Sequence, residues 1–141
     1  MEEPLPPDDR TGGELVRRLG VPIAAGESLY TRFGFRDVIA QRRVDIVQPD
    51  ITKCGGFTEA KAISQNAVAW NLRVSPHCWG TGLSQAATLQ LLSTLPDAPF
   101  GRTGAPLHYL EFDRGHNPLR EGVLTEPIQA VDGRVTVPHG P

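Results

Sequence analysis

The stretch VDIVQPDITKCGG, residues 44–56, decides how the rest of the chain is interpreted. Residues 44–47 are nearly all apolar, which is typical of a parallel strand buried on both faces. The run ends in a turn that carries Asp50 and Lys53, and a Gly-Gly pair then leads into a helical pattern. A buried strand followed by an ionisable residue and a helix is the repeating unit of parallel α/β folds.

The same alternation extends in both directions from this stretch. It predicts strands at the chain start and at residues 21–25, 44–47, 72–75 and 107–112. It predicts helices at residues 11–19, 31–41, 58–70 and 82–95. A Pro/Gly loop is expected at residues 96–106, and no helical periodicity follows Asp113. The turn Asp132-Gly133 predicts a short strand at residues 134–137. Parallel strands joined by right-handed crossovers are therefore expected.

One ionisable side chain follows each expected strand, at intervals of 25, 23, 27 and 34 residues. These side chains belong to Glu2, Glu27, Asp50, His77 and Glu111. A barrel of parallel strands gathers the carboxyl ends of its strands on one face, where its chemistry takes place. A doubly wound open sheet has the same strand count but binds its ligand in a single crevice. The spacing favours the barrel.

Length and composition narrow the possible functions. A complete α/β barrel needs about 250 residues, and this chain has 141. A net charge of −2 without a basic run argues against a nucleic-acid surface. No apolar stretch is long enough to span a membrane. Cys54 and Cys78 match neither a metal motif nor a disulfide framework, so a reducing, cytoplasmic location is expected.

Two pairs of residues suggest metal-assisted acid–base chemistry. Glu2 and Glu27 offer carboxylate oxygens, the ligands that Mg²⁺ prefers. Alternatively, Glu2 is a surface charge at a frayed terminus, and Glu27 lies next to a helix N-cap, where the helix dipole stabilises it. Asp50 beside His77 would fix the imidazole tautomer and leave the other ring nitrogen to move a proton. Alternatively, Asp50 caps a turn and His77 is a half-buried structural histidine.

Three further side chains allow more than one interpretation. Lys53 is a second base, an electrophile or a solvated lysine. Glu111 either donates to an oxyanion or pairs with Arg114. Cys78 would be a nucleophile only with His77 as its base.

These residues stand in strings that together resemble a known family. The strings are EEP (2–4), GES (26–28), DIVQPDITKCGG (45–56), SPHCWGTG (75–82) and YLEFD (109–113). In this order they resemble the C-terminal half of the barrels of the enolase superfamily, in the mandelate racemase and muconate-lactonizing branch. The tail EFDRGHNPLREGVLTEP (111–127) is most similar to acid-sugar members, including galactarolactone cycloisomerases and sugar-acid dehydratases.

The resemblance implies a fold and a role for each residue. The fold would be α/β, the C-terminal half of a TIM-type (β/α)7β barrel. Glu2 and Glu27 would be Mg²⁺ ligands, and Asp50 and His77 the dyad that removes a proton α to the carboxylate of a small-molecule substrate. Glu111 would hydrogen-bond the enediolate oxygen opposite the metal. Lys53 matches a position where some relatives have a lysine base. In relatives that use an Asp–His dyad, the lysine at this position has only a supporting role.

The resemblance also implies a division of the chain and missing parts. Residues 1–112 would be the partial barrel, and residues 113–141 an extension that packs against a capping domain. The first Mg²⁺ ligand and an opposing lysine base would precede Met1. We therefore expect a weak catalyst that self-associates or pairs with the missing barrel half, acting by dehydration, racemisation or cycloisomerisation. The alternatives are a noncatalytic complementing half-barrel and a truncated gene product.

Overall fold

The computed structural model describes residues 1–9, 12–96 and 108–139. Within them a parallel sheet is formed by β1 (Ala24–Ala25), β2 (Ile46–Val47) and β3 (Arg73–Val74), in the order β1-β2-β3. An isolated parallel bridge joins Glu2 to Ala24, so the chain start lies beside β1. The predicted parallel α/β alternation is confirmed, although each strand is only two residues long.

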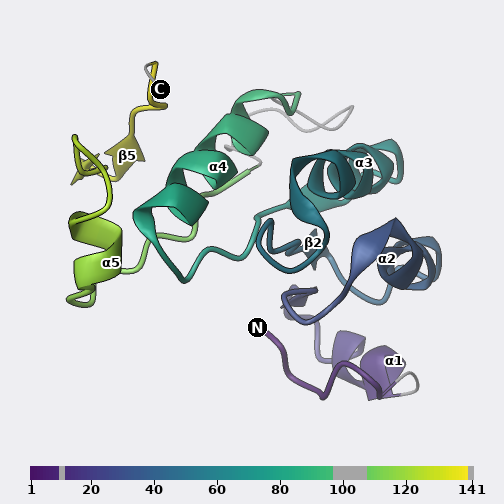
Figure 1. Cartoon of the computed structure of the whole chain (residues 1–141). Coiled ribbons are helices and arrows are strands. Elements are labelled where there is room, and N and C mark those ends of the chain that lie inside the picture. Colours follow the sequence, from purple (N-terminus) through teal and green to yellow (C-terminus); the bar gives the residue numbers. More distant parts are fainter. Residues whose placement is uncertain (10–11, 97–107, 140–141) are drawn as a thin grey trace.

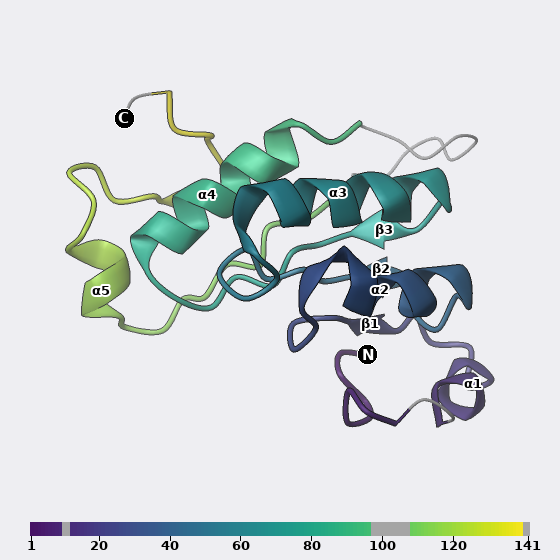
Figure 2. The same cartoon turned by 45° about the vertical axis from the view of Figure 1, so that its right-hand side comes forward.

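Four helices follow the chain around one side of this sheet: α1 (Gly12–Arg17), α2 (Thr31–Ala40), α3 (Gly56–Ala69) and α4 (Gly82–Ser93). Figures 1 and 2 show these helices in chain order, from α1 near the N-terminus, through α2 and α3, to α4 beside α3. All four were predicted, with ends that differ by a few residues. The α3 helix starts earlier than predicted, because Gly55 and Gly56 turn the chain into it with φ of 112° and 79°, angles at which glycine is favoured.

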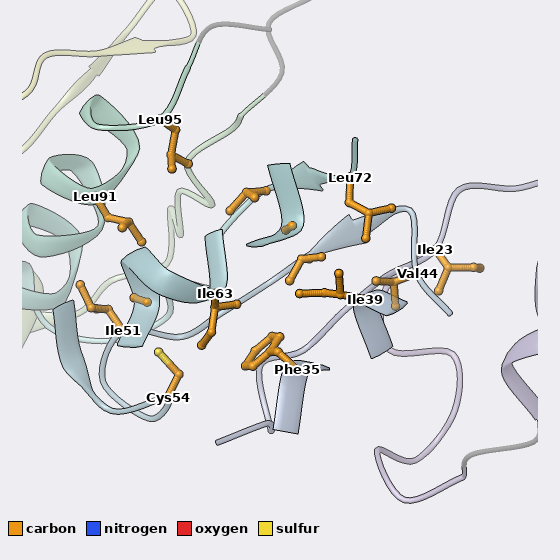
Figure 3. Packing of buried hydrophobic residues seen from close by; sticks show 14 residues of the cluster. Ile23, Phe35, Ile39, Val44, Ile51, Cys54, Ile63, Leu72, Leu91 and Leu95 are labelled. Atoms are coloured by element: carbon orange, nitrogen blue, oxygen red, sulfur yellow. The ribbon is translucent and has the colours of Figure 1, made fainter. Parts of the chain in front are cut away.

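The hydrophobic core lies between the sheet and the helices (Figure 3). Phe35 and Ile39 of α2 and Ile63 of α3 are fully buried against Val47 and Val74 of the sheet. Two large apolar residues of these helical segments lie outside the core: Trp70 is 41% and Leu83 is 64% exposed. Trp70 lies at the end of α3, and Leu83 is in the first turn of α4, so both are at the margin of the packed layer.

The prediction of a strand at residues 107–112 is wrong for its described part. Residues 108–112 carry no regular strand. The segment nevertheless runs beside β3, because the His108 ring lies against the backbone of Val74, with Nδ1 3.0 Å from the carbonyl oxygen, and the Ser75 hydroxyl donates to the carbonyl of Tyr109. These hydrogen bonds run through the His108 and Ser75 side chains, whereas a strand ladder joins backbone N–H and C=O groups.

The C-terminal segment contains more structure than periodicity indicated. A short helix, α5 (Pro118–Glu121), follows Asn117, whose side chain accepts hydrogen bonds from the N–H groups of Leu119 and Arg120. The hairpin of β4 (Ala130–Val131) and β5 (Arg134–Val135) confirms the reversal at Asp132-Gly133. The segment packs on α4, since α5 contacts that helix. Packing against a capping domain remains a prediction, and the 96–106 loop falls largely outside the described residues.

Candidate active site at the carboxyl ends of the strands

The buried pair Asp50–His77 is the centre of the candidate site. Asp50 follows β2 and His77 follows β3, and the two adjacent strands bring Asp50 Oδ2 to 2.9 Å from His77 Nδ1. Both residues are buried, with exposures of 5% and 6%. The contact joins residues that are 27 positions apart, and it forms because parallel neighbours end at the same edge of a sheet.

Asp50 is held on its other side by Thr52. The Thr52 hydroxyl and backbone N–H donate to Asp50 Oδ1 at 2.6 and 2.8 Å. Burial alone would raise the pKa of Asp50, but the hydrogen bonds from Thr52 and His77 outweigh burial and lower the pKa below its usual value. Asp50 is therefore ionised at neutral pH, and its Oδ2 accepts the proton of His77 Nδ1. The sequence signal for Thr52 was the Asp-x-Thr turn pattern.

Glu27 lies against the other ring nitrogen of the same histidine. Glu27 Oε2 is 3.1 Å from His77 Nε2, and the carboxylate is about one-third exposed. Glu27 follows β1, the strand that pairs with β2. The imidazole is thus placed between a buried carboxylate and a more accessible one. The residue that the family strings assign to the metal is therefore a direct neighbour of the proposed base.

Lys53 and Glu111 border this centre in different ways. Lys53 Nζ lies 3.6 Å from Asp50 Oδ2, while its side chain is 41% exposed. Glu111 is half-buried, and its Oε2 accepts a 2.7 Å hydrogen bond from the backbone N–H of Cys78, the residue after His77. Lys53 is thus an ion-pair partner of the dyad, and Glu111 is tied to the loop that carries the imidazole.

Glu2 lies at the exposed edge of the group, where Gln48 holds it. Gln48 Nε2 donates to Glu2 Oε1 at 2.6 Å, and the neighbouring Glu3 accepts the N–H of Gly26. The structure gives no direct contact between Glu2 and Glu27. Gln48 was not among the predicted site residues, although strand alternation could have identified it, because Gln48 and Asp50 are two residues apart.

Two carboxylates are a partial fit to a divalent cation. Glu2 and Glu27 are oxygen donors of the type that Mg²⁺ prefers, and each has one oxygen engaged, by Gln48 and His77 respectively. No group of three or more His, Cys, Asp or Glu suited to a metal ion occurs among residues 1–9, 12–96 and 108–139. The described residues would therefore supply two protein ligands, and water or further groups would complete the coordination.

The two cysteines do not supply a nucleophile. Burial, followed by the nearby charge of Asp50, raises the pKa of Cys54 to about 11. Burial also raises the pKa of Cys78. At neutral pH both are thiols, whereas nucleophilic cysteine chemistry requires the thiolate.

The fold and this geometry define a class of protein: α/β barrels that carry acid–base residues at the carboxyl ends of parallel strands. The whole chain, residues 1–141, matches the family described as enolase C-terminal domain-like, and it belongs to that family. The fold is accordingly the C-terminal half of a TIM-type barrel. The resemblance read from the five strings is confirmed.

Curated relatives include acid-sugar enzymes. The chain is 41% identical over its full length to D-galactarolactone cycloisomerase of Agrobacterium fabrum, covering 37% of that protein. It is 31% identical over its full length to arabinonate dehydratase of Saccharolobus solfataricus, covering 35%. The chain thus spans about a third of the length of these relatives.

Solved structures agree on the fold. The crystal structure of 3,6-anhydro-D-galactonate cycloisomerase from Zobellia galactanivorans superposes with a TM-score of 0.83 at 36% identity, over 97% of this chain and 36% of that one. A mandelate racemase/muconate lactonizing enzyme from Sulfitobacter sp. gives a TM-score of 0.81 at 28% identity, over 98% and 32%. None of the helices within residues 1–9, 12–96 and 108–139 has the length and apolar character of a membrane span.

Proposed function

We propose that the chain carries the proton-transfer half of the active site of a Mg²⁺-dependent acid-sugar or hydroxy-acid isomerase or dehydratase. The reaction would begin by removal of the proton α to the substrate carboxylate. The observation that supports this proposal best is the buried 2.9 Å contact between Asp50 and His77. The relatives, a galactarolactone cycloisomerase and an arabinonate dehydratase, support the class of substrate. Two free, buried cysteines agree with a cytoplasmic location.

His77 is the proposed base. Asp50 accepts the Nδ1 proton, so Nε2 is the ring nitrogen that would exchange a proton with the substrate, once its contact with Glu27 is given up. Nε2 points toward Glu27, 3.1 Å away. The base is therefore adjacent to a residue that would help to bind the substrate carboxylate through the cation. A lone base of this kind contributes about 10²–10⁴-fold to rate.

Glu2 and Glu27 are the proposed cation ligands, and Glu111 the proposed acid on the opposite oxygen. A bound Mg²⁺ would supply positive charge near the substrate carboxylate, where negative charge grows as the proton leaves. Glu111, held by the N–H of Cys78, would hydrogen-bond the enediolate oxygen. Lys53 would remain supportive, since it faces Asp50 and is partly exposed.

The test is hydrogen–deuterium exchange at the α carbon, because this partial reaction needs no later step. D-galactonate, arabinonate and D-galactarolactone are each incubated with the chain and Mg²⁺ in D₂O, and the α proton is followed by NMR. We expect slow exchange, with a rate far below that of a complete barrel enzyme. His77→Asn should lower the rate about 100-fold or more.

His116→Asn is the matched control, because His116 is an exposed imidazole on the C-terminal segment. It should exchange like the parent chain. Equal rates for His77→Asn and the parent would remove His77 from the reaction. No exchange with any of the three acids would refute the proposal for the 141-residue chain.

A noncatalytic, complementing half-barrel is the second candidate. It is favoured by the large apolar side chains on the surface, among them Phe33 and Trp79, which are 71% and 73% exposed. Under this alternative the chain pairs with a copy of itself or with another barrel half. Exchange dependent on His77 would favour the first candidate over this one.

A further inference from the structure

Gln48 is a buried polar residue at the mouth of the half-barrel. It directly follows β2, whose last residue, Val47, belongs to the core between the sheet and the helices. Successive side chains of a strand point to opposite faces, so Gln48 projects to the face away from the helices. Gln48 is only 6% exposed.

The amide nitrogen of Gln48 restrains Glu2. Nε2 donates to Glu2 Oε1 at 2.6 Å, although the two residues are 46 positions apart. Glu2 bridges to Ala24 of β1, and β1 pairs with β2, so this hydrogen bond crosses one strand. Glu2 is otherwise exposed near the chain start. The hydrogen bond thus ties the exposed Glu2 side chain to the buried Gln48 side chain.

The amide oxygen of Gln48 has no such partner. Oε1 is buried and makes no hydrogen bond to any described residue. Leaving a buried acceptor unpaired destabilises the folded state. Such a group in a native fold calls for an explanation, and a donor that arrives with a bound ligand is one. An O–H group, from water or from a hydroxy acid, is the matching chemistry.

Building on the proposed function, we propose that Gln48 is a positioning residue of the cation site. Its NH₂ group fixes one oxygen of Glu2, so that the carboxylate presents the other oxygen to a divalent cation. Its carbonyl oxygen accepts a hydrogen bond from an O–H donor in the occupied site. Residues that orient a ligand in this way change metal affinity by about 10–100-fold when they are replaced.

Mn²⁺ tests this proposal on the 141-residue chain itself. Carboxylate sites accept Mn²⁺ as well as Mg²⁺, and its paramagnetism broadens NMR signals close to the ion even when binding is weak. In the parent chain we expect selective broadening of the amides of Glu2 and Glu27 and of the Gln48 side-chain NH₂. Gln48→Leu should raise the apparent Mn²⁺ dissociation constant about tenfold or more.

Further variants sharpen the result. Gln85→Leu is the matched control, because Gln85 is also buried with an unpartnered Oε1 but lies on α4. It should leave Mn²⁺ binding unchanged. Gln48→Asn keeps the amide but is one methylene too short to reach Glu2, so it should lose affinity like Gln48→Leu. In a Glu2→Gln background, Gln48→Leu should have little further effect. Circular dichroism confirms that each variant is folded.

The outcomes separate the two proposals. Loss of affinity in Gln48→Leu with Mn²⁺ alone supports positioning with water as the O–H donor. Loss that appears only when D-galactonate is present supports a substrate hydroxyl as the donor. If Glu27→Gln weakens Mn²⁺ binding and Gln48→Leu does not, the role of Gln48 is refuted while the cation site stands. If Mn²⁺ broadens neither Glu2 nor Glu27 in the parent chain, both proposals fall.

Discussion

At the scale of single residues, the two oxygens of the Asp50 carboxylate have different partners. Oδ1 receives both the hydroxyl and the N–H of Thr52, while Oδ2 faces His77 Nδ1 and the more distant Lys53. This division determines which oxygen is available to the imidazole. The orientation of the proposed base therefore depends on a threonine that does not itself touch it.

Replacing Thr52 by valine tests this dependence. Thr52→Val removes the hydroxyl but keeps the backbone N–H and the shape of the side chain. Because one of the hydrogen bonds that lower the pKa of Asp50 is lost, that pKa should rise, and the chain should lose about 1–2 kcal/mol of stability. The α-proton exchange should slow as well. Carboxyl ¹³C titration and urea unfolding measure these effects, and Thr52→Ser should restore both; an unchanged Asp50 titration would contradict the argument.

The lowered pKa of Asp50 also predicts a pH dependence of stability. A carboxyl group whose pKa is lower in the folded than in the unfolded state stabilises the fold above its ordinary pKa of about 3.9. That contribution disappears as the pH falls through the lowered folded-state value. The free energy of unfolding of the parent chain should therefore fall more steeply below about pH 4 than that of Asp50→Asn. If the free energies of unfolding of the two proteins change in parallel from neutral to acid pH, the pKa of Asp50 is not lowered by folding.

At the scale of elements, Gly26 joins β1 to the loop that carries Glu27. Its φ is +134°, and a Cβ placed there would lie 2.7 Å from the Phe35 ring and 3.2 Å from the Gln48 carbonyl oxygen. Backbone strain and overpacking each cost about 1–3 kcal/mol. We expect Gly26→Ala to destabilise the fold by about 3 kcal/mol and to disturb the Glu27–His77 contact.

Gly20→Ala is the matched control for this prediction. Gly20 also has a positive φ, +72°, but nothing lies within 4 Å of its added Cβ. It should therefore lose only about 1 kcal/mol, the cost of the left-handed conformation. Urea unfolding of both variants separates strain from steric overlap. Similar losses at the two positions would contradict the role assigned to the Phe35 and Gln48 contacts.

Sequence patterns were most informative for the elements that repeat. Helical spacing predicted α2 and α3, because each helix buries one face, and an apolar run predicted β2. Asp50 and His77 were then predicted from the positions where β2 and β3 end. Residues 108–112 could not be identified correctly, since the segment is joined to β3 by His108 and Ser75 side chains rather than by a ladder.

The α5 helix is four residues long, too short for periodicity, and only its Asn-Pro start signals it. Strand alternation places Gln48 on the same face as Asp50, but its hydrogen bond to Glu2, 46 residues away, leaves no local pattern in the sequence.

At the scale of the whole molecule, the chain has more surface than a compact monomer of its size. A folded protein of 15.3 kDa exposes about 7,100 Å² by the usual scaling. This chain exposes 8846 Å². Large apolar side chains contribute to the excess at both ends of the structure, with Leu15 and Leu19 near α1, and Leu83 and Leu119 on α4 and α5. The three-stranded sheet is open, whereas a closed barrel has no free edge.

We therefore predict that the 141-residue chain self-associates. Burying the exposed apolar groups would contribute about 25 cal/mol for each Å² removed from water, and pairing the open edges would satisfy free backbone groups. Sedimentation equilibrium should give a mass above 15.3 kDa that rises with protein concentration. Leu83→Lys combined with Leu119→Lys should lower the association constant, whereas Lys61→Arg, which keeps its charge, should not. A single 15.3-kDa species at every accessible concentration, folded by circular dichroism, would show that the half-barrel is stable without a partner.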